Sequence, residues 1–213
     1  MRKMIHIAVL GALSIALSAA GQRAPAPRAQ FSSSERADLS KISAYMNNIP
    51  AMKGSFIQIA DNGASAQGYF YIEKPGRMRF EYLPPSPILI VSDGSTISVE
   101  NKRLNTVDRY PLDGTPLELI LSNDINLGRD RAVTSVETQP GAIIVHARSN
   151  NRRAQGNIAI TFSAPEIELR QWTIRDSQGK TTTVVLRNAQ TVQSLPKDLF
   201  ALNTKPETPA KPN

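Results

Sequence analysis

The alternation of apolar and charged residues constrains the fold of this chain more than any other feature. In residues 77–82 (RMRFEY) every second residue is apolar and the residues between are charged. Successive side chains of a strand point to opposite faces of a sheet, so this pattern indicates a strand with one dry face and one wet face. Such strands are typical of antiparallel sheets that pack on one side only.

Turn signals recur at short intervals and separate the β-rich runs of the chain. They lie at 61–63 (DNG), 75–76 (PG), 92–94 (SDG), 140–141 (PG) and 177–179 (SQG). Residues 88–91 and 96–99 are predicted to form one hairpin. Residues 172–174 and 181–186 are predicted to form another. The periodicity and the turns together predict a long antiparallel meander of about ten strands.

Two segments break the period of two and predict helices. The first begins with a capping-box pair, Ser32 and Glu35, and ends before Pro50. Its apolar residues recur at spacings of three and four, and they are Leu39, Ile42, Met46 and Ile49. The second, 115–121 (TPLELIL), has a Thr at the expected cap and a Pro at the first helical position. A short apolar helix in a β protein is expected to cover an apolar surface, and a last short helix or turn is expected near Pro196.

The two ends of the chain differ from its middle. Residues 1–20 combine a basic start, an apolar run and a small-residue stretch, which predicts a secretory signal peptide with cleavage after Ala20. Residues 21–31 and 203–213 are rich in Pro and polar residues and are predicted to be disordered. Residues 32–202 are predicted to form one domain. We expect the mature protein to be soluble and periplasmic.

Composition excludes several function classes. The chain has no Cys, so we expect neither disulfides nor a lipid anchor of its own. Removal of residues 1–20 lowers the formal charge from +7 to +5, and the dispersed basic residues form no run interleaved with aromatics, which argues against nucleic acid as a partner. No phosphate-binding loop, no nucleophile elbow and no metal-ligand spacing is present, and His146 is interpreted as an ordinary strand residue. We therefore predict no metal and no enzyme, with a hydrolase as the weaker alternative.

Five sequence blocks carry a family resemblance. They are 54–58 (GSFIQ), 68–82 (GYFYIEKPGRMRFEY), 90–94 (IVSDG), 115–121 (TPLELIL) and 172–181 (WTIRDSQGKT). In this order they resemble the LolA family of outer-membrane lipoprotein carriers over nearly the whole mature domain. The Lys-Pro-Gly-Arg strand and the Ser-Asp-Gly turn after it are the most specific part.

The resemblance implies a fold and a function. The implied fold is mainly β: an unclosed antiparallel β-barrel of about eleven strands, with short helices as a lid over a hydrophobic cavity. The implied function is that of a periplasmic chaperone that binds the acyl chains of lipoproteins and delivers them to the outer membrane, without cofactor or nucleotide. Its implied partners are acylated lipoproteins, an inner-membrane ABC transporter of the LolCDE type and an outer-membrane receptor lipoprotein of the LolB type. We expect a monomer, and a lipid-binding or envelope-stress sensing module on the same fold is the alternative.

Candidate site residues follow from the periodicity and the resemblance together. The predicted acyl-chain cavity consists of Met78, Phe80, Tyr82, Leu39, Ile42, Met46, Trp172 and Ile174. The predicted lid residues are Leu117, Ile120 and Leu121. Where the family has a lid-latching Arg before the Pro-Gly turn this chain has Lys74, so the resemblance assigns the latch to Lys74, with Arg77 or Arg79 as substitutes.

Overall fold

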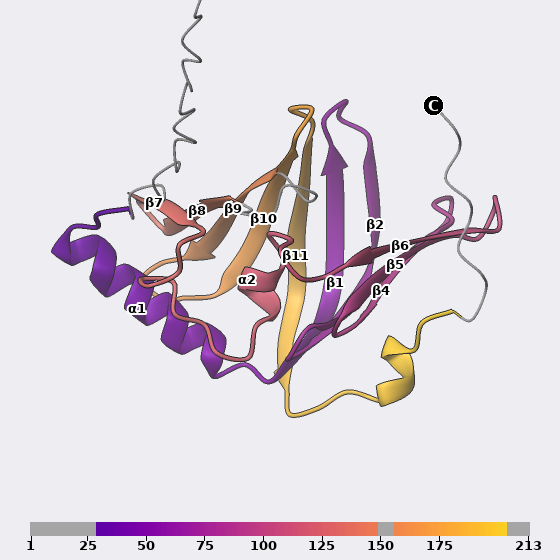
Figure 1. Ribbon diagram of the computed structural model, residues 1–213, viewed down its shortest axis with the longest axis horizontal. Coiled ribbons are helices and arrows are strands. Elements are labelled where there is room, and N and C mark those ends of the chain that lie inside the picture. Colours follow the sequence, from indigo (N-terminus) through magenta and orange to yellow (C-terminus); the bar gives the residue numbers. More distant parts are fainter. Residues whose placement is uncertain (1–28, 149–155, 204–213) are drawn as a thin grey trace, which may run out of the picture.

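The computed structural model describes residues 29–148 and 156–203 (Figure 1). The predicted signal peptide and most of the two predicted disordered segments lie outside these residues. Phe31, which the sequence assigns to the N-terminal segment, packs against the core.

Eleven antiparallel strands form one sheet in the described residues (Figure 1). The strands are β1 (Ala51–Ala60), β2 (Ser65–Glu73), β3 (Arg77–Tyr82), β4 (Ile88–Asp93), β5 (Thr96–Asn101), β6 (Thr106–Pro111), β7 (Val133–Gln139), β8 (Ala142–Arg148), β9 (Gly156–Ser163), β10 (Leu169–Asp176) and β11 (Thr181–Val192). Their order is β6-β5-β4-β3-β2-β1-β11-β10-β9-β8-β7. The predicted mainly-β fold is confirmed, with eleven strands where the periodicity alone predicts about ten.

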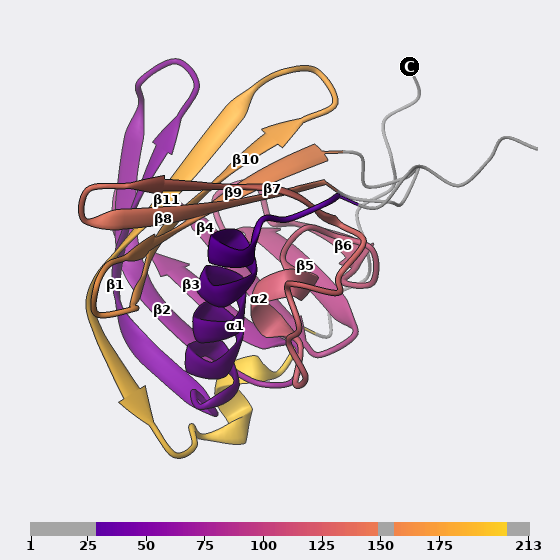
Figure 2. The same cartoon turned by 90° about the vertical axis from the view of Figure 1, so that its left-hand side faces the viewer.

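The sheet curls without closing, so β6 and β7 remain its two edge strands. Helix α1 (Ser33–Asn47) lies across the open side with the short helix α2 (Glu118–Leu121) beside it (Figure 2). Apolar side chains of the concave face and of both helices form one hydrophobic core. The most buried of the large side chains are Phe56, Phe70 and Phe162.

Two glycines provide the room that the inner face needs. A Cβ at Gly68 would lie 2.1 Å from the carbonyl oxygen of Glu81 and 2.8 Å from the ring of Phe56. A Cβ at Gly54 would lie 2.8 Å from the ring of Phe70. Both aromatic rings therefore lie over a strand position without a side chain, which lets neighbouring strands approach closely where the sheet bends.

The capping box predicted for the first helix is present. The backbone N–H of Glu35 donates to Oγ of Ser32 at 3.2 Å, and the N–H of Ser32 donates to Oε2 of Glu35 at 2.6 Å. The helix thus satisfies two of its free N–H groups with its own side chains.

The second predicted helix is shorter than expected, and its predicted cap is wrong. Helix α2 spans only Glu118–Leu121, and Oγ1 of Thr115 is buried without a hydrogen-bond partner in the described part of the chain. The carboxylate of Glu118 accepts a hydrogen bond from the N–H of Gly114 at 3.1 Å instead. A side chain inside the helix, and not the predicted Thr, therefore fixes the turn before it.

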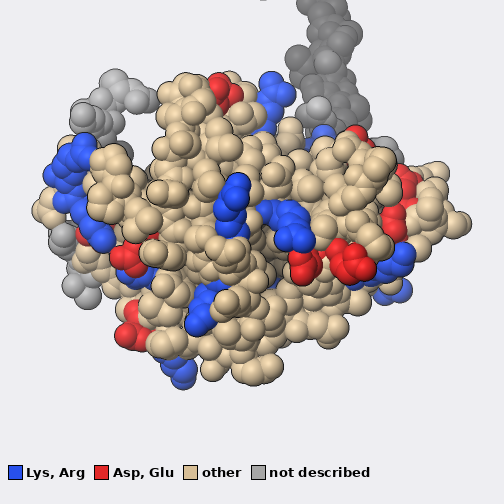
Figure 3. Space-filling view, turned by 180° about the vertical axis from the view of Figure 1, so that it is seen from behind, with Lys and Arg blue, Asp and Glu red and all other residues tan. Residues whose placement is uncertain are grey.

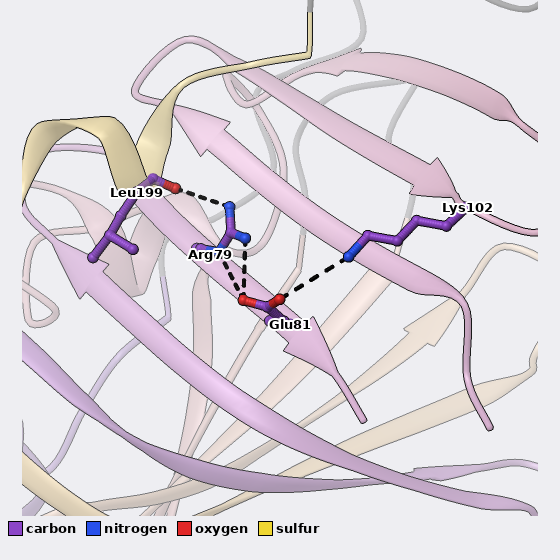
Figure 4. Close-up of polar contacts among 4 residues, drawn as sticks. All are labelled: Arg79, Glu81, Lys102 and Leu199. Carbon is purple, nitrogen blue, oxygen red and sulfur yellow. Dashed lines mark hydrogen bonds and ion pairs between the residues drawn. The ribbon is translucent and has the colours of Figure 1, made fainter. Parts of the chain in front are cut away.

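The C-terminal segment packs on the convex face of the sheet. It contains a 3-10 helix, η1 (Lys197–Phe200), which contacts β3 and β4. Nη1 of Arg79 donates to the carbonyl oxygen of Leu199 at 3.3 Å, while the same guanidinium binds Glu81 (Figure 4). The guanidinium of Arg77 lies 5.8 Å from the ring centroid of Phe200, which is 3% exposed. The sheet therefore carries a cover on each face.

Candidate functional site

Aromatic rings dominate the middle of the concave face. Phe80 lies 5.0 Å from Phe56, 6.1 Å from Phe70 and 5.9 Å from Trp172, measured between ring centroids. These rings come from β1, β2, β3 and β10, so they join the two halves of the sheet. A surface of such aromatic rings suits a flexible apolar ligand.

The predicted cavity residues of β3 point to this face. Met78 and Phe80 are buried, and Tyr82 is partly buried with its ring 5.0 Å from Phe56. Burial raises the pKa of Tyr82 to about 12, and its hydroxyl donates to Oε1 of Gln58. Ile174, the other partly buried member of the predicted set, packs against the same core.

Helix α1 supplies the other side of the predicted cavity. Leu39 and Ile42 are fully buried and Met46 is 4% exposed, all in the core cluster that contains Phe80 and Trp172. The structure therefore brings together every residue of the predicted cavity set. The predicted lid residues are expected to pack on the cavity when it is empty, and apolar side chains of α1 and α2 lie in the same core as the cavity residues.

The connection between the two edge strands completes the cover. Residues 112–132 run from the end of β6 to the start of β7 and include α2. Ile120 and Leu121 are each 2% exposed, and Leu117 packs against the core with partial exposure. Three further buried residues of this connection are missing from the sequence prediction: Leu112, Ile125 and Leu127. Ile125 and Leu127 are separated by one residue in a polar loop. Two apolar residues at this spacing are too short a pattern to predict burial from the sequence.

Polar side chains of α1 tie this connection to the helix. Nδ2 of Asn47 donates to the carbonyl oxygen of Ile125 at 2.9 Å, and the N–H of Ile125 donates to Oδ1 of Asn47 at 2.9 Å. Oγ of Ser43 accepts from the N–H of Leu127 at 3.1 Å. Helix α1 and residues 112–132 therefore behave as one cover, which we name the lid.

A few polar contacts fasten the lid to the sheet. The ammonium group of Lys74 donates to the carbonyl oxygen of Met46, near the end of α1. The N–H of Gly76 donates to the carbonyl oxygen of Leu121, at the end of α2, at 2.9 Å. The turn between β2 and β3 thus holds the last turn of both helices. Burial lowers the pKa of Lys74 from 10.5 to about 8. On the other side of the lid, the hydroxyl of Tyr45 accepts from the N–H of Leu169 at 3.1 Å.

The other two predicted latch residues point away from the lid. Arg77 pairs with Glu73 at 3.2 Å and lies over Phe200, while Arg79 contacts Leu199. Both side chains are on the convex face because they occupy odd positions of β3. The latch assignment thus remains a prediction for Lys74, whose observed contact is with α1.

Cavities of the described residues lie at the rim of the core. One of about 270 Å³ lies beside the lid, lined by residues that include Thr115, Leu119 and Arg148. Another of about 580 Å³ lies where β10 meets β11. Neither is lined by Met78 or Phe80, both of which are buried.

Ionisable groups are scattered over the surface. Lys and Arg side chains are spread over the face shown in Figure 3, and several of them lie next to Asp or Glu side chains. His146 lies 3.6 Å from Glu137 on an exposed part of β8. The described residues hold no group of three or more His, Cys, Asp or Glu side chains that could bind a metal. None of the described helices is long and apolar enough to cross a membrane.

Comparisons with known proteins point in one direction. The outer-membrane lipoprotein carrier protein of Ralstonia nicotianae is 25% identical over 212 residues, covering 93% of this chain and 92% of that protein. The protein of the same name from Chromobacterium violaceum is 26% identical over 196 residues, covering 89% and 90%. A solved LolA superfamily protein from Nitrosomonas europaea aligns with a TM-score of 0.41 at 10% identity, over 77% of this chain and 97% of that one.

The sequence model of the family described as outer membrane lipoprotein carrier protein LolA matches residues 47–203. This match takes in all eleven strands and the connection between β6 and β7. The chain belongs to the LolA family of outer-membrane lipoprotein carrier proteins.

Proposed function

We propose that this protein is a periplasmic carrier that binds the acyl chains of lipoproteins between its lid and the concave face of its sheet. The observation that carries the proposal is the aromatic face around Phe80, which lies in one hydrophobic core with the lid's apolar side chains. An acyl chain offers the same non-directional contacts as these side chains. It can therefore replace their apolar contacts, while the few hydrogen bonds that fasten the lid must open.

The lid gives the carrier a moderate affinity. Burial of an acyl chain gains about 0.8 kcal/mol per CH₂, so one long chain gains on the order of 10 kcal/mol. Cargo bound at that strength to an empty, preformed cavity would leave slowly. Ile120 and Leu121 are buried and must be displaced first. The free energy that the lid loses when these side chains are exposed therefore lowers the net free energy of cargo binding.

The remaining steps of the proposal concern delivery. The predicted signal peptide places the mature chain in the periplasm, where a LolCDE-type ABC transporter would supply lipoproteins from the inner membrane. A LolB-type receptor lipoprotein would take them at the outer membrane. The carrier acts as a monomer, needs no nucleotide and performs no catalysis.

Native mass spectrometry of the protein, purified from the periplasm of cells that produce it, tests the proposal directly. One-to-one complexes with acylated lipoproteins are expected, and proteomics of the bound material identifies them. Bound phospholipid without lipoprotein would contradict the carrier function and favour a lipid-sensing module on the same fold.

Substitution of a wall residue tests the site itself. Met78→Glu places a carboxylate without a partner against the acyl chain, which costs about 3 kcal/mol or more, so affinity for a triacylated lipoprotein should fall at least about a hundredfold. Tyr82→Glu, at a partly buried position of the same face, provides a second variant with a milder effect on folding. Leu104→Glu, at a residue that is 68% exposed in the turn after β5, is the matched control. Unchanged binding by both wall variants would reject this site.

A further inference from the structure

The ladder between β10 and β11 stops halfway along β11. Its last pair is Gln171 with Val185, whereas β1 stays paired with β11 as far as Val192. In the described structure, the stretch from Leu186 to Val192 therefore has a partner strand on one side only, and Figure 1 shows β11 continuing past the start of β10. An unpaired strand edge presents free N–H and C=O groups to any extended chain.

The free stretch is open on both faces as well. All five residues from Arg187 to Thr191 are exposed, although strand residues with one face on a core usually alternate. The register with β1 shifts between Lys53 and Ser55, and Asn188 has a φ of 50°. This part of β11 consequently stands clear of the core while β1 holds it in place.

A cavity of about 580 Å³ lies beside this edge and joins the core to the surface. Its lining includes Met52, Leu169 and Leu186, which belong to the hydrophobic core. Its outer lining includes Arg170 and Arg187. We name the cavity and the free edge Leu186–Val192 together the β11 notch.

Tyr45 of the lid closes the inner end of the notch. Its hydroxyl accepts from the N–H of Leu169, the first residue of β10, and its ring packs edge-on against Phe162 at 6.3 Å. Tyr45 thus takes the position of a strand partner just where β10 and β11 separate. Movement of α1 to admit cargo would withdraw Tyr45 and open the notch toward the aromatic face.

We propose that the β11 notch binds the extended polypeptide that follows the acylated N-terminal cysteine of the cargo, as an added strand on β11. The inference depends on the proposed carrier function. When the acyl chains of a lipoprotein are held in the core, its polypeptide must emerge at the surface. The point of emergence has to be apolar toward the core and has to offer hydrogen-bonding groups toward the surface, and the notch combines both properties. Main-chain hydrogen bonds to β11 do not depend on sequence, which suits a carrier of many different lipoproteins.

The notch also favours acidic residues in this segment. Arg170 is paired with Glu168 at 2.6 Å, whereas Arg187 forms no ion pair within the described residues. Arg187 lies at the start of the free stretch, next to the position where the peptide would emerge. An Asp or Glu close to the acylated cysteine would pair with it.

Photo-crosslinking tests the location of the peptide. A benzoylphenylalanine replaces Gln190 in the notch, Tyr82 on the aromatic face or Leu104 as an exposed control, and the probe is a synthetic peptide whose N-terminal cysteine carries three acyl chains. We expect Gln190 to crosslink to the first residues of the peptide, Tyr82 to its acyl chains, and Leu104 to neither. Crosslinks at Tyr82 with none at Gln190 would overturn the notch and leave the carrier function standing, whereas no crosslink at Tyr82 would contradict the carrier function itself.

Charge reversal tests the preference for acidic residues. Arg187→Glu should weaken binding of a triacylated peptide with Asp and Glu after its cysteine roughly two- to fivefold, and should strengthen binding of a Lys-containing version. Lys180→Glu, at the exposed turn before β11, makes the same change in net charge and should leave both affinities unchanged. An equal effect of the two variants would mean that only long-range electrostatic attraction is involved, and it would contradict a direct contact between the peptide and Arg187.

Discussion

The two faces of β3 hold their covers in different ways. On the concave side, Met78 and Phe80 contact a lid that is packed through apolar side chains and fastened by a few hydrogen bonds. On the convex side, Arg77 and Arg79 hold the C-terminal segment through a cation–π contact and a hydrogen bond to a backbone carbonyl oxygen. One strand thus anchors both covers through alternate residues.

The difference determines which cover a lipid can replace. Apolar contacts are non-directional, so an acyl chain can take over those of Ile120 and Leu121. A guanidinium that binds a carbonyl oxygen requires a donor and an acceptor in fixed positions, which an acyl chain lacks. In the proposed function the lid is therefore the cover that cargo replaces, and the C-terminal segment stays in place.

The largest expected effects come from one truncation in each cover. Phe200→Ala should lower the free energy of unfolding by about 3–5 kcal/mol and leave cargo affinity unchanged, because the C-terminal segment does not compete with acyl chains. Leu121→Ala should lower it by about 2–5 kcal/mol and raise cargo affinity about tenfold or more, because a weaker lid competes less. Urea unfolding and titration with a triacylated peptide measure the two quantities. A gain in affinity for Phe200→Ala equal to that for Leu121→Ala would remove the distinction between the covers.

A smaller effect is expected where the two parts of the lid are joined. Asn47→Ala leaves the buried N–H and carbonyl oxygen of Ile125 without partners, which costs about 1–3 kcal/mol. Hydrogen exchange should become faster at the Ile125 amide while the amides in the middle of α1 remain protected. The exposed neighbour Asn126, changed to Ala, is the control. Faster exchange throughout α1 would instead mean that the helix depends on this pair of bonds.

The smallest effect, because solvent screens the partly exposed ammonium group, is the pH dependence of the contact made by Lys74. Its pKa is about 8 in the folded protein and 10.5 in the unfolded chain, so between these values the unfolded chain binds the proton more tightly. The free energy of unfolding contributed by Lys74 should therefore rise as pH increases from about 8 to about 10.5 and be flat below this window. Unfolding of the wild type and of Lys74→Met at several pH values measures it. Parallel curves for the two proteins would show that burial does not perturb Lys74.

The sequence predicts the sheet well because each strand carries its own signal. The alternation in residues 77–82 places Met78 and Phe80 on the dry face, and the turn signals at 92–94 and 177–179 lie where β4 turns into β5 and where β10 turns into β11. The capping box at Ser32 fixes the start of α1 in the same local way. These features depend on neighbouring residues only, so they are visible without a structure.

The lid could be predicted only in part, because its contacts join distant parts of the chain. Asn47 and Ile125 are far apart in sequence, and nothing in either segment indicates their reciprocal hydrogen bonds. Thr115 has the residue type of a cap, but its Oγ1 forms no hydrogen bond in the described residues and Leu117 is the residue before the helix.

The connection 112–132 is covalently attached at both ends, to β6 and to β7. If cargo displaces it as proposed, the connection cannot diffuse away, so it remains beside the aromatic face at an effective concentration in the millimolar range typical of short tethers. Its return would be unimolecular and independent of protein concentration. Under the proposed function, unloading would then need only an acceptor for the acyl chains, because the competitor that refills the site never leaves the molecule.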